Sequence, residues 1–294
     1  MRATFYEEIS RNKRNSLILA ILVSFVLFAI SYVFLLFFGY SLFIIVLIIE
    51  VVYIYVTYTK GDQIVLKSVN AQPADDVKNR FLVDTVEGLA IAAGVPKPKI
   101  YIMESPEINA FATGKDPKHA SVCVTTGALE NLKRDELEGV IAHEMSHVQN
   151  YDVRFATIVA VMVGLVAIIS HVIIRSFRYG NFRAKGKGGA AILVLFVIAL
   201  ILAIFAPLIS RLVQAAVSRK RELLADSNGV KLTRYPDGLA SALEKIMKKN
   251  QGKMNVSESV SHLFISDPNK SPLDRLFATH PPLEERIKIL RAMG

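Results

Sequence analysis

The chain has 294 residues and a net charge of +9, and 52% of its residues are hydrophobic. Its mean hydropathy of +0.38 exceeds that of ordinary soluble domains, so part of the chain is expected to face lipid. A positive charge suits either nucleic acid or an anionic membrane surface. The apolar runs favour the membrane, and no RNA-binding or helix-turn-helix signature is found, so no nucleic-acid partner is expected. The single cysteine, Cys123, excludes an intramolecular disulfide and a zinc site built from several cysteines.

Four apolar stretches follow one another along the chain, at residues 17–38, 41–58, 155–174 and 190–213. Each approaches the length of about 20 residues that crosses the hydrocarbon core of a bilayer. The first stretch follows basic residues, but it is too long for a signal peptide and no small-residue cleavage site comes after it. We predict an uncleaved helical hairpin that turns at Gly39, and a second hairpin formed by the last two stretches.

The distribution of Lys and Arg predicts the orientation. The turn at Gly39 carries neither, whereas the segment before the first stretch carries Arg2, Arg11, Lys13 and Arg14. Because cytoplasmic segments are rich in Lys and Arg, the N-terminus and the polar segments 59–154 and 214–294 are predicted to be cytoplasmic. The link between the last two stretches opposes this orientation, since it carries Arg175, Arg178, Arg183, Lys185 and Lys187. An arrangement in which helices three and four only enter the membrane partway therefore stays open.

The two polar segments are typical of a globular α+β domain. Hydrophobic periodicity and turn residues predict helices at 74–93 and 133–149 and short strands at 98–103, 110–112 and 121–125. Residues 250–271 are rich in Ser, Asn and Lys and predict a mobile loop near the cleft. His119 and His262 have polar neighbours in the sequence and are expected at the surface.

The residues His143-Glu144-Met145-Ser146-His147 lie within the predicted helix 133–149. Residues four apart share one face of a helix, so the two imidazoles can bind the same zinc ion. The carboxylate of Glu144 can then act as general base toward the attacking water. A catalytic zinc site also needs a third protein ligand and one open position.

The third ligand must come from elsewhere, because no further histidine follows closely after His147. The best candidate is Glu222, with Asp226 four residues later on the same predicted helix face. One carboxylate can bind zinc while the other accepts a hydrogen bond from a ligand imidazole. Spacing alone leaves open whether Glu222 binds the metal or both residues belong to a solvated, charged helix face.

Together, four motifs resemble the HtpX family of membrane-bound zinc metalloproteases, over essentially the whole chain. They are His143 to His147, Glu222 to Asp226, Asn109-Ala110-Phe111-Ala112, and Ala278-Thr279-His280-Pro281-Pro282-Leu283-Glu284. The resemblance implies that Glu222 is a zinc ligand and that Asp226 supports a ligand imidazole. It also implies that the strand Asn109 to Ala112 pairs with the substrate backbone, and that His280 steadies the tetrahedral oxyanion near the zinc.

We therefore predict a predominantly α membrane protein. A four-helix membrane anchor, formed by 1–58 and 155–213, carries a cytoplasmic α+β zincin-like metalloprotease domain. Segment 59–154 supplies the paired histidines and segment 214–294 supplies the third ligand. The helix with His143 leads into the third apolar stretch through Asp152 and Arg154, which places the site close to the headgroups of the bilayer. The expected location is the plasma membrane, with several spans and an active site that faces the cytoplasm.

The predicted activity is that of a zinc metalloendopeptidase with one Zn²⁺ per chain, acting on membrane proteins or their cytoplasmic loops. The resemblance implies a role in membrane protein quality control and stress. One alternative is a CAAX-prenyl endopeptidase, which shares the zinc motifs but has more than four spans. A second is an inactive membrane scaffold with a structural zinc, which would not need Glu144. A third is a transporter or channel, which the large polar segments disfavour.

Overall fold

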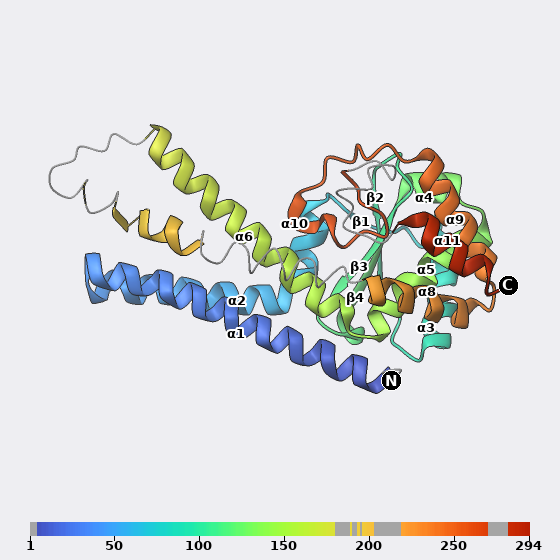
Figure 1. Ribbon diagram of the computed structural model, residues 1–294, viewed down its shortest axis with the longest axis horizontal. Coiled ribbons are helices and arrows are strands. Elements are labelled where there is room, and N and C mark those ends of the chain that lie inside the picture. Colours follow the sequence, from blue (N-terminus) through green and yellow to red (C-terminus); the bar gives the residue numbers. More distant parts are fainter. Residues whose placement is uncertain (1–4, 180–188, 190–192, 195, 203–218, 270–281) are drawn as a thin grey trace.

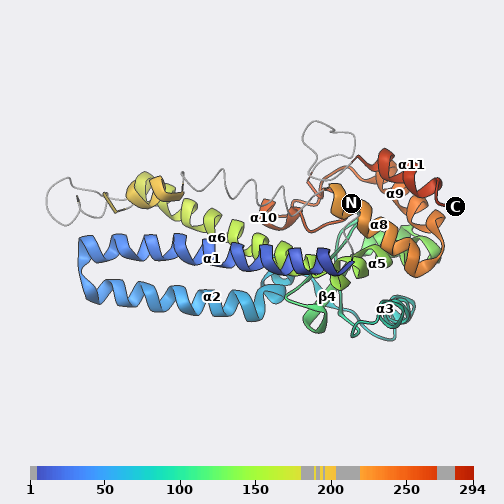
Figure 2. The same ribbon diagram turned by 60° about the horizontal axis from the view of Figure 1, so that its bottom comes forward.

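The computed structural model describes residues 5–179, 189, 193–194, 196–202, 219–269 and 282–294. Helices α1 (Phe5–Phe38), α2 (Tyr40–Ser68) and α6 (Asp152–Tyr179) lie alongside one another and extend away from a globular part that contains the sheet (Figures 1 and 2). The chain is thus mostly helical, with one small sheet at the end of a bundle of long helices.

Helices α1 and α2 form a hairpin with Gly39 as the only residue between them. Gly39 has φ +81°, a left-handed conformation that glycine adopts without a steric penalty. Within the described residues, Ile9–Phe37 and Tyr40–Ser68 are long and apolar enough to cross a membrane. Large apolar side chains such as Leu36 and Ile49 are exposed along these helices, as expected for surfaces that contact lipid.

Helix α2 does not end where its apolar run ends. The sequence places a domain boundary after residue 58, but α2 continues to Ser68 without a break. Lys60 and Asp62 interrupt the apolar run, yet neither residue type terminates a helix. The last turns of α2 place Val65 and Leu66 in a buried cluster of the globular part.

The sheet has four strands in the order β1-β2-β4-β3. They are β1 (Gln72–Pro73), β2 (Lys99–Met103), β3 (Ala110–Gly114) and β4 (Ala120–Thr125). β2 and β4 are parallel, and the other two pairs are antiparallel. The three strands predicted from the sequence are present, with β3 two residues longer at its end. β3 lies at one edge of the sheet, so its outer side pairs with none of the other three strands.

The main hydrophobic core joins this sheet to the helices around it. The helices are α3 (Arg80–Ala93), α4 (Thr126–Asn131), α5 (Arg134–Gln149), α8 (Arg219–Thr233), α9 (Pro236–Lys249) and α11 (Leu283–Arg291). The short helix α10 (Glu258–Ser261) contributes Val260 to a second buried cluster. Val86, Val124, Ile141 and Leu243 are buried side chains of this core. α3 ends at Gly94 as predicted, but it begins at Arg80, because Asp75 caps a separate turn through the N–H groups of residues 77 and 78.

The third apolar stretch lies in α6, which begins directly after α5. The fourth stretch, 190–213, falls mostly outside the described residues. Its described members Val194, Ile198 and Leu202 pack against Ile30 and Val33 of α1. The described residues therefore contain one clearly apolar helical hairpin and a third long helix packed against it.

Candidate active site

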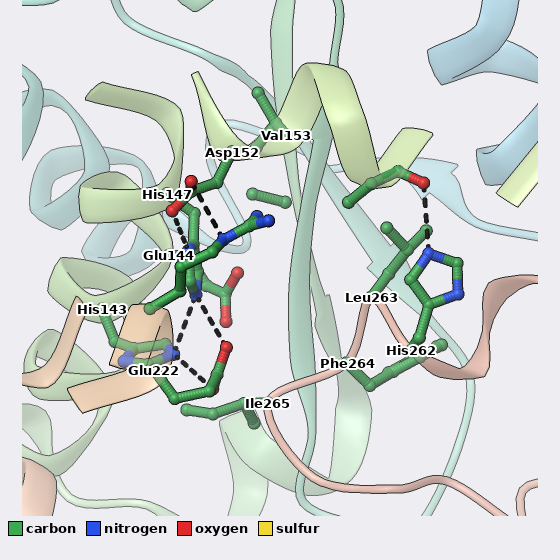
Figure 3. A pocket seen from close by; sticks show the side chains of 13 residues that line it. His143, Glu144, His147, Asp152, Val153, Glu222, His262, Leu263, Phe264 and Ile265 are labelled. Atoms are coloured by element: carbon green, nitrogen blue, oxygen red, sulfur yellow. Dashed lines mark hydrogen bonds and ion pairs between the residues drawn. The ribbon is translucent and has the colours of Figure 1, made fainter. Parts of the chain in front are cut away.

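Two helices that are distant in sequence bring the predicted metal ligands together. α5 carries His143, Glu144 and His147, and α8 carries Glu222 (Figure 3). The helices approach closely because α8 has a glycine at position 229, where a Cβ atom would lie 3.1 Å from the backbone nitrogen of His143. A larger residue there would push α8, and Glu222 with it, away from the two histidines.

The ligand atoms are spaced as a shared metal ion requires. The Nε2 atoms of His143 and His147 are 3.2 Å apart. Glu222 lies 3.6 Å from the first through Oε2 and 3.5 Å from the second through Oε1. In a tetrahedral zinc site with Zn–N bonds of about 2.0–2.1 Å, two coordinating nitrogens lie about 3.3 Å apart. Among the described residues, these three form the group that could hold a metal ion.

The second nitrogen of each imidazole is held by a carboxylate. Nδ1 of His143 is 2.9 Å from Oδ1 of Asp226, and Nδ1 of His147 is 2.9 Å from Oδ2 of Asp152. Since an ionised carboxylate only accepts hydrogen bonds, each Nδ1 carries a hydrogen, and Nε2 is the ring nitrogen left to bind a metal ion. The two Nε2 atoms lie 3.2 Å apart beside the Glu222 carboxylate, and all three can donate to one cation, so this donor set fits a divalent metal ion.

Asp152 is a site residue that the sequence analysis did not identify. It was placed only in the connection to the third apolar stretch, but it is the first residue of α6 and its side chain is buried. Nε of Arg221 lies 3.2 Å from Oδ1, the other oxygen of the Asp152 carboxylate. The available signal was weak: an acidic residue five positions after His147, at the start of a helix, can fold back onto the preceding histidine.

Arg286 of α11 is the second residue that was missed. It is entirely buried, and its guanidinium contacts Asp226 at 2.7 Å and Glu222 at 3.6 Å. Burial by itself raises the pKa of Asp226, but the charge of Arg286 and the hydrogen bonds from Arg286 and His143 lower it to about 2. The signal in the sequence was a charged residue on the buried face of α11, between the apolar Leu283 and Leu290.

The electrostatics of the site favour a positive charge between the histidines. Burial of the His143 imidazole lowers its pKa, but hydrogen bonds to Asp226 and Glu222 outweigh burial and raise the pKa to about 9. Burial also raises the pKa of the adjacent Glu144 carboxyl. A carboxylate made more basic in this way is better suited to accept a proton near neutral pH.

A partly open cleft lies beside these residues, with about 380 Å³ of empty space that includes its opening to solvent. It is lined by Ala112 of β3, by Ala156 of α6 and by the segment 262–265. That segment occupies part of the outer edge of β3: the N–H of Ile265 donates to the carbonyl of Ala110 at 3.0 Å, and Phe264 bridges to Phe111. Of the four residues predicted to bind substrate, Ala112 lines the cleft. The side chain of Asn109 instead donates to the backbone carbonyl of Ser266.

The loop predicted at 250–271 lies near the cleft through residues 262–265, but the expectation that His262 lies at the surface is wrong. His262 is buried, with Nε2 3.1 Å from the carbonyl oxygen of Ala156. Buried polar side chains here bond to the backbone: Asn250 accepts from the N–H of Ile108, and Glu107 accepts from the N–H of Gln251. The other histidine expected at the surface, His119, is exposed. His280 lies outside the described residues.

Comparisons with known proteins agree with this geometry. The model of peptidase family M48 matches residues 76–294. A protease HtpX homolog of Caldanaerobacter subterraneus subsp. tengcongensis is 45% identical, and one of Thermoanaerobacter pseudethanolicus is 47% identical; each match covers 99% of both chains. The crystal structure of S. mikatae Ste24p shares the fold, with a TM-score of 0.51 and 21% identity over 97% of this chain and 67% of that one. The chain therefore belongs to peptidase family M48, among the membrane metalloproteases of the HtpX type.

Proposed function

We propose that this metalloprotease is a zinc-dependent endopeptidase that cleaves membrane proteins or their cytoplasmic loops. One Zn²⁺ per chain would be held by His143, His147 and Glu222. The observation that carries the proposal is the 3.2 Å approach of the two Nε2 atoms, with a carboxylate beside them and another carboxylate behind each ring. Zinc bound there would supply Lewis acidity, polarising the scissile carbonyl and making water more acidic.

The residues of the chain supply the proton transfers and the orientation. Glu144 takes a proton from the water that attacks the scissile carbonyl and delivers it to the departing amine, so that one C–N bond is exchanged for one C–O bond. Asp226 and Asp152 hold the imidazoles of His143 and His147 in the tautomer that presents Nε2 to the metal. Arg286 keeps the Asp226 carboxyl ionised, and the resemblance assigns His280 to the oxyanion.

The edge of β3 is the proposed site for the substrate backbone. Ala112 lines the cavity beside Glu144, and an extended peptide can add to the free side of an edge strand. Residues 264 and 265 already occupy this edge next to Ala110 and Phe111. Strand addition along the whole of Asn109 to Ala112 therefore requires that the segment 262–265 moves away from β3.

The proposed domain arrangement follows the sequence analysis: hairpins at 1–58 and 155–213 form a four-helix membrane anchor, and segments 59–154 and 214–294 form a cytoplasmic catalytic domain. Exposed apolar side chains on α1 and α2 support the first hairpin, and the packing of Val194 and Ile198 against α1 supports the second. A multi-pass location in the plasma membrane and a role in membrane protein quality control complete the proposal.

The test combines metal analysis with proteolysis by the full chain in detergent. Wild type is expected to hold one zinc per chain and to cleave casein or a membrane protein substrate, with loss of cleavage when a chelator removes the metal. Glu144→Gln should retain zinc and lose about 10²–10⁴-fold in rate, because the base is gone while the ligands remain. Glu138→Gln, an exposed position on the same helix, is the matched control and should keep full activity.

Two results would count against the proposal. Full activity of Glu144→Gln would remove Glu144 from the reaction, and a wild-type chain with tightly held zinc but no cleavage of any protein would favour the structural-zinc alternative. The CAAX-prenyl alternative predicts cleavage of a prenylated CAAX peptide by the same Glu144-dependent site. The membrane endopeptidase proposed here predicts cleavage of unprenylated protein loops instead.

A further inference from the structure

The corner between α5 and α6 contains a contact that the proposed chemistry does not yet use. Asn12 lies on α1, before the apolar run of that helix, and it is buried with 3% of its surface exposed. Its side-chain nitrogen Nδ2 donates to Oδ1 of Asp152 at 2.6 Å and to the backbone carbonyl of Asn150 at 3.0 Å. The two N–H bonds of one amide group are thereby both used.

These two acceptors lie on opposite sides of a sharp change in chain direction. Asn150 caps the end of α5, Asp152 begins α6, and only Tyr151 separates them. Tyr151 has φ +62°, a left-handed conformation that is unfavourable for a non-glycine residue and persists only where its surroundings hold it. Asn12 donates to Asn150 and Asp152, the residues on either side of Tyr151. The ammonium of Lys13 lies 4.3 Å from the ring centroid of Tyr151.

The corner is directly connected to the proposed metal site. Oδ2 of Asp152 holds Nδ1 of His147, while Oδ1 of the same carboxylate receives Asn12. Three side chains thus form a chain of hydrogen bonds that runs from the first helix to the imidazole. An Asp side chain has two rotatable bonds, so a donor fixed on one oxygen determines where the other oxygen points.

We infer that Asn12 is a positioning residue for the metal site: through Asp152 it fixes the ring of His147, so the first membrane helix is part of the active site. This inference rests on the proposed role of His147 as a zinc ligand. It assigns to α1 a function beyond anchoring, because the same helix that enters the membrane also orients a metal ligand. Release of α1 from the corner should weaken zinc binding without removing any ligand.

The test measures zinc affinity by competition with a chelator, using the full chain in detergent. Loss of a carboxylate that supports a ligand histidine costs about 10–100-fold in affinity, and Asn12 acts one step further out, so Asn12→Ala is expected to cost about three- to tenfold. Asn12→Leu keeps a similar side-chain volume but lacks the donor, and it should lose zinc affinity to the same extent. It replaces Asn12→Ala in the test if the cavity left by Ala perturbs folding. Asn15→Ala, which removes a half-buried asparagine from the same helix, is the matched control and should bind zinc as wild type does.

A double-mutant cycle separates positioning from a general structural effect. If Asn12 acts through Asp152, Asn12→Ala should have no further effect on zinc affinity in an Asp152→Ala background. An equal loss in both backgrounds, or no loss in the wild-type background, would overturn the inference. The proposed function is tested separately, since a wild-type chain without zinc, or a His147→Ala variant that keeps it, would contradict the ligand assignment itself.

Discussion

Arg286 donates to both carboxylate oxygens of Asp226, from Nε at 2.9 Å and from Nη2 at 2.7 Å. Neither side chain is exposed by more than 1%. A pair with this bidentate geometry, away from water, is among the strongest hydrogen-bonded ion pairs in proteins. The pair connects α11, near the end of the chain, to α8 and through Asp226 to His143 of α5.

Removal of the guanidinium should destabilise the protein and the metal site together. Arg286→Leu leaves the buried Asp226 charge without its partner, at an expected cost of about 3–5 kcal/mol in the free energy of unfolding. Arg286→Lys keeps the charge but loses the second hydrogen bond, so the cost should be smaller. The measurement is denaturant unfolding of the detergent-solubilised chain, together with zinc content.

Arg291 on the same helix provides the control for this experiment. It pairs with Asp237 and Glu244, and its side chain is 40% exposed. Exposed ion pairs contribute about 0–1 kcal/mol, so Arg291→Ala should change stability little and zinc content not at all. Equal effects of the two arginine substitutions would contradict the special role given to Arg286.

The different roles proposed for Glu222 and Asp226, as metal ligand and as hydrogen-bond acceptor of a ligand imidazole, give a second prediction. Glu222→Ala leaves two imidazoles, which are too few for a stable catalytic site, so this variant should contain no zinc and have no activity. Asp226→Ala should keep most of its zinc when the metal is plentiful, with affinity or turnover reduced about 10–100-fold. Zinc per chain at matched metal concentration distinguishes the roles. An empty Asp226→Ala and a full Glu222→Ala would reverse them.

The paired motif on α5 shows what local spacing can predict. His143, Glu144 and His147 follow from helical periodicity within one element, and the same argument narrowed the third ligand to Glu222 or Asp226. Asn12, Asp152 and Arg286 could not be found in this way. Asn12 and Asp152 are 140 residues apart, and Asp226 and Arg286 are 60 apart, so only the packing of helices brings them together.

The secondary structure shows the same difference: elements defined by their own sequence are predicted, and those that depend on contacts with distant residues are not. The strands β2, β3 and β4 and the helix α5 carry their own periodicity and turn residues, and the sequence predicts all of them. The two-residue strand β1 exists only because it pairs with β2. Residues 250–266 have the composition of a solvated loop, but the buried Glu107 and Asn109 provide the partners for their backbone and keep them in place.

A third prediction concerns the segment that occupies the edge of β3. The rings of Phe111 and Phe264 are 4.8 Å apart, and this contact holds residues 264 and 265 where a substrate strand is proposed to bind. Phe264→Ala should loosen the segment and speed the cleavage of a short, unstructured peptide, with zinc content unchanged. The measurement is the kcat/KM for such a peptide, with thermal unfolding to verify that the protein stays folded.

The opposite result would be equally informative. If folded, zinc-loaded Phe264→Ala cleaves the peptide more slowly than wild type, residues 264 and 265 form part of the binding surface and do not block it. Leu263 lines the same cavity but makes no ring contact with Phe111. Leu263→Ala is therefore the control for a general loss of apolar surface in the cleft.

The proposed topology predicts which positions react with a membrane-impermeant maleimide in intact cells. Lys60→Cys and Met293→Cys, both at exposed positions, should react only after the membrane is opened. Gly186→Cys, which lies outside the described residues, should react from the exterior. The native Cys123 should stay unlabelled throughout, because it is buried and burial raises the pKa of its thiol.

Labelling of Gly186→Cys only after permeabilisation would contradict the four-helix anchor. The third and fourth helices would then enter the membrane without crossing it, as the basic residues between them also allow. Labelling of Lys60→Cys in intact cells would instead invert the whole orientation. The two variants therefore distinguish a wrong number of crossings from a wrong direction.

The unbroken course of α2 has a consequence for which bonds can be cut. Residues 59–64 add about 9 Å of helix between the end of the apolar run and Val65, where α2 joins the buried cluster of the globular part. A helix, unlike a flexible linker, keeps its length, so with α2 crossing the bilayer as proposed, the catalytic cleft would stand at a set height above the lipid. An extended peptide covers about 3.3 Å per residue, so a substrate anchored in the same bilayer needs a tether of about three residues before its scissile bond. Loops shorter than this would escape cleavage whatever their sequence. The distance between the scissile bond and the membrane would therefore select substrates before their sequence does.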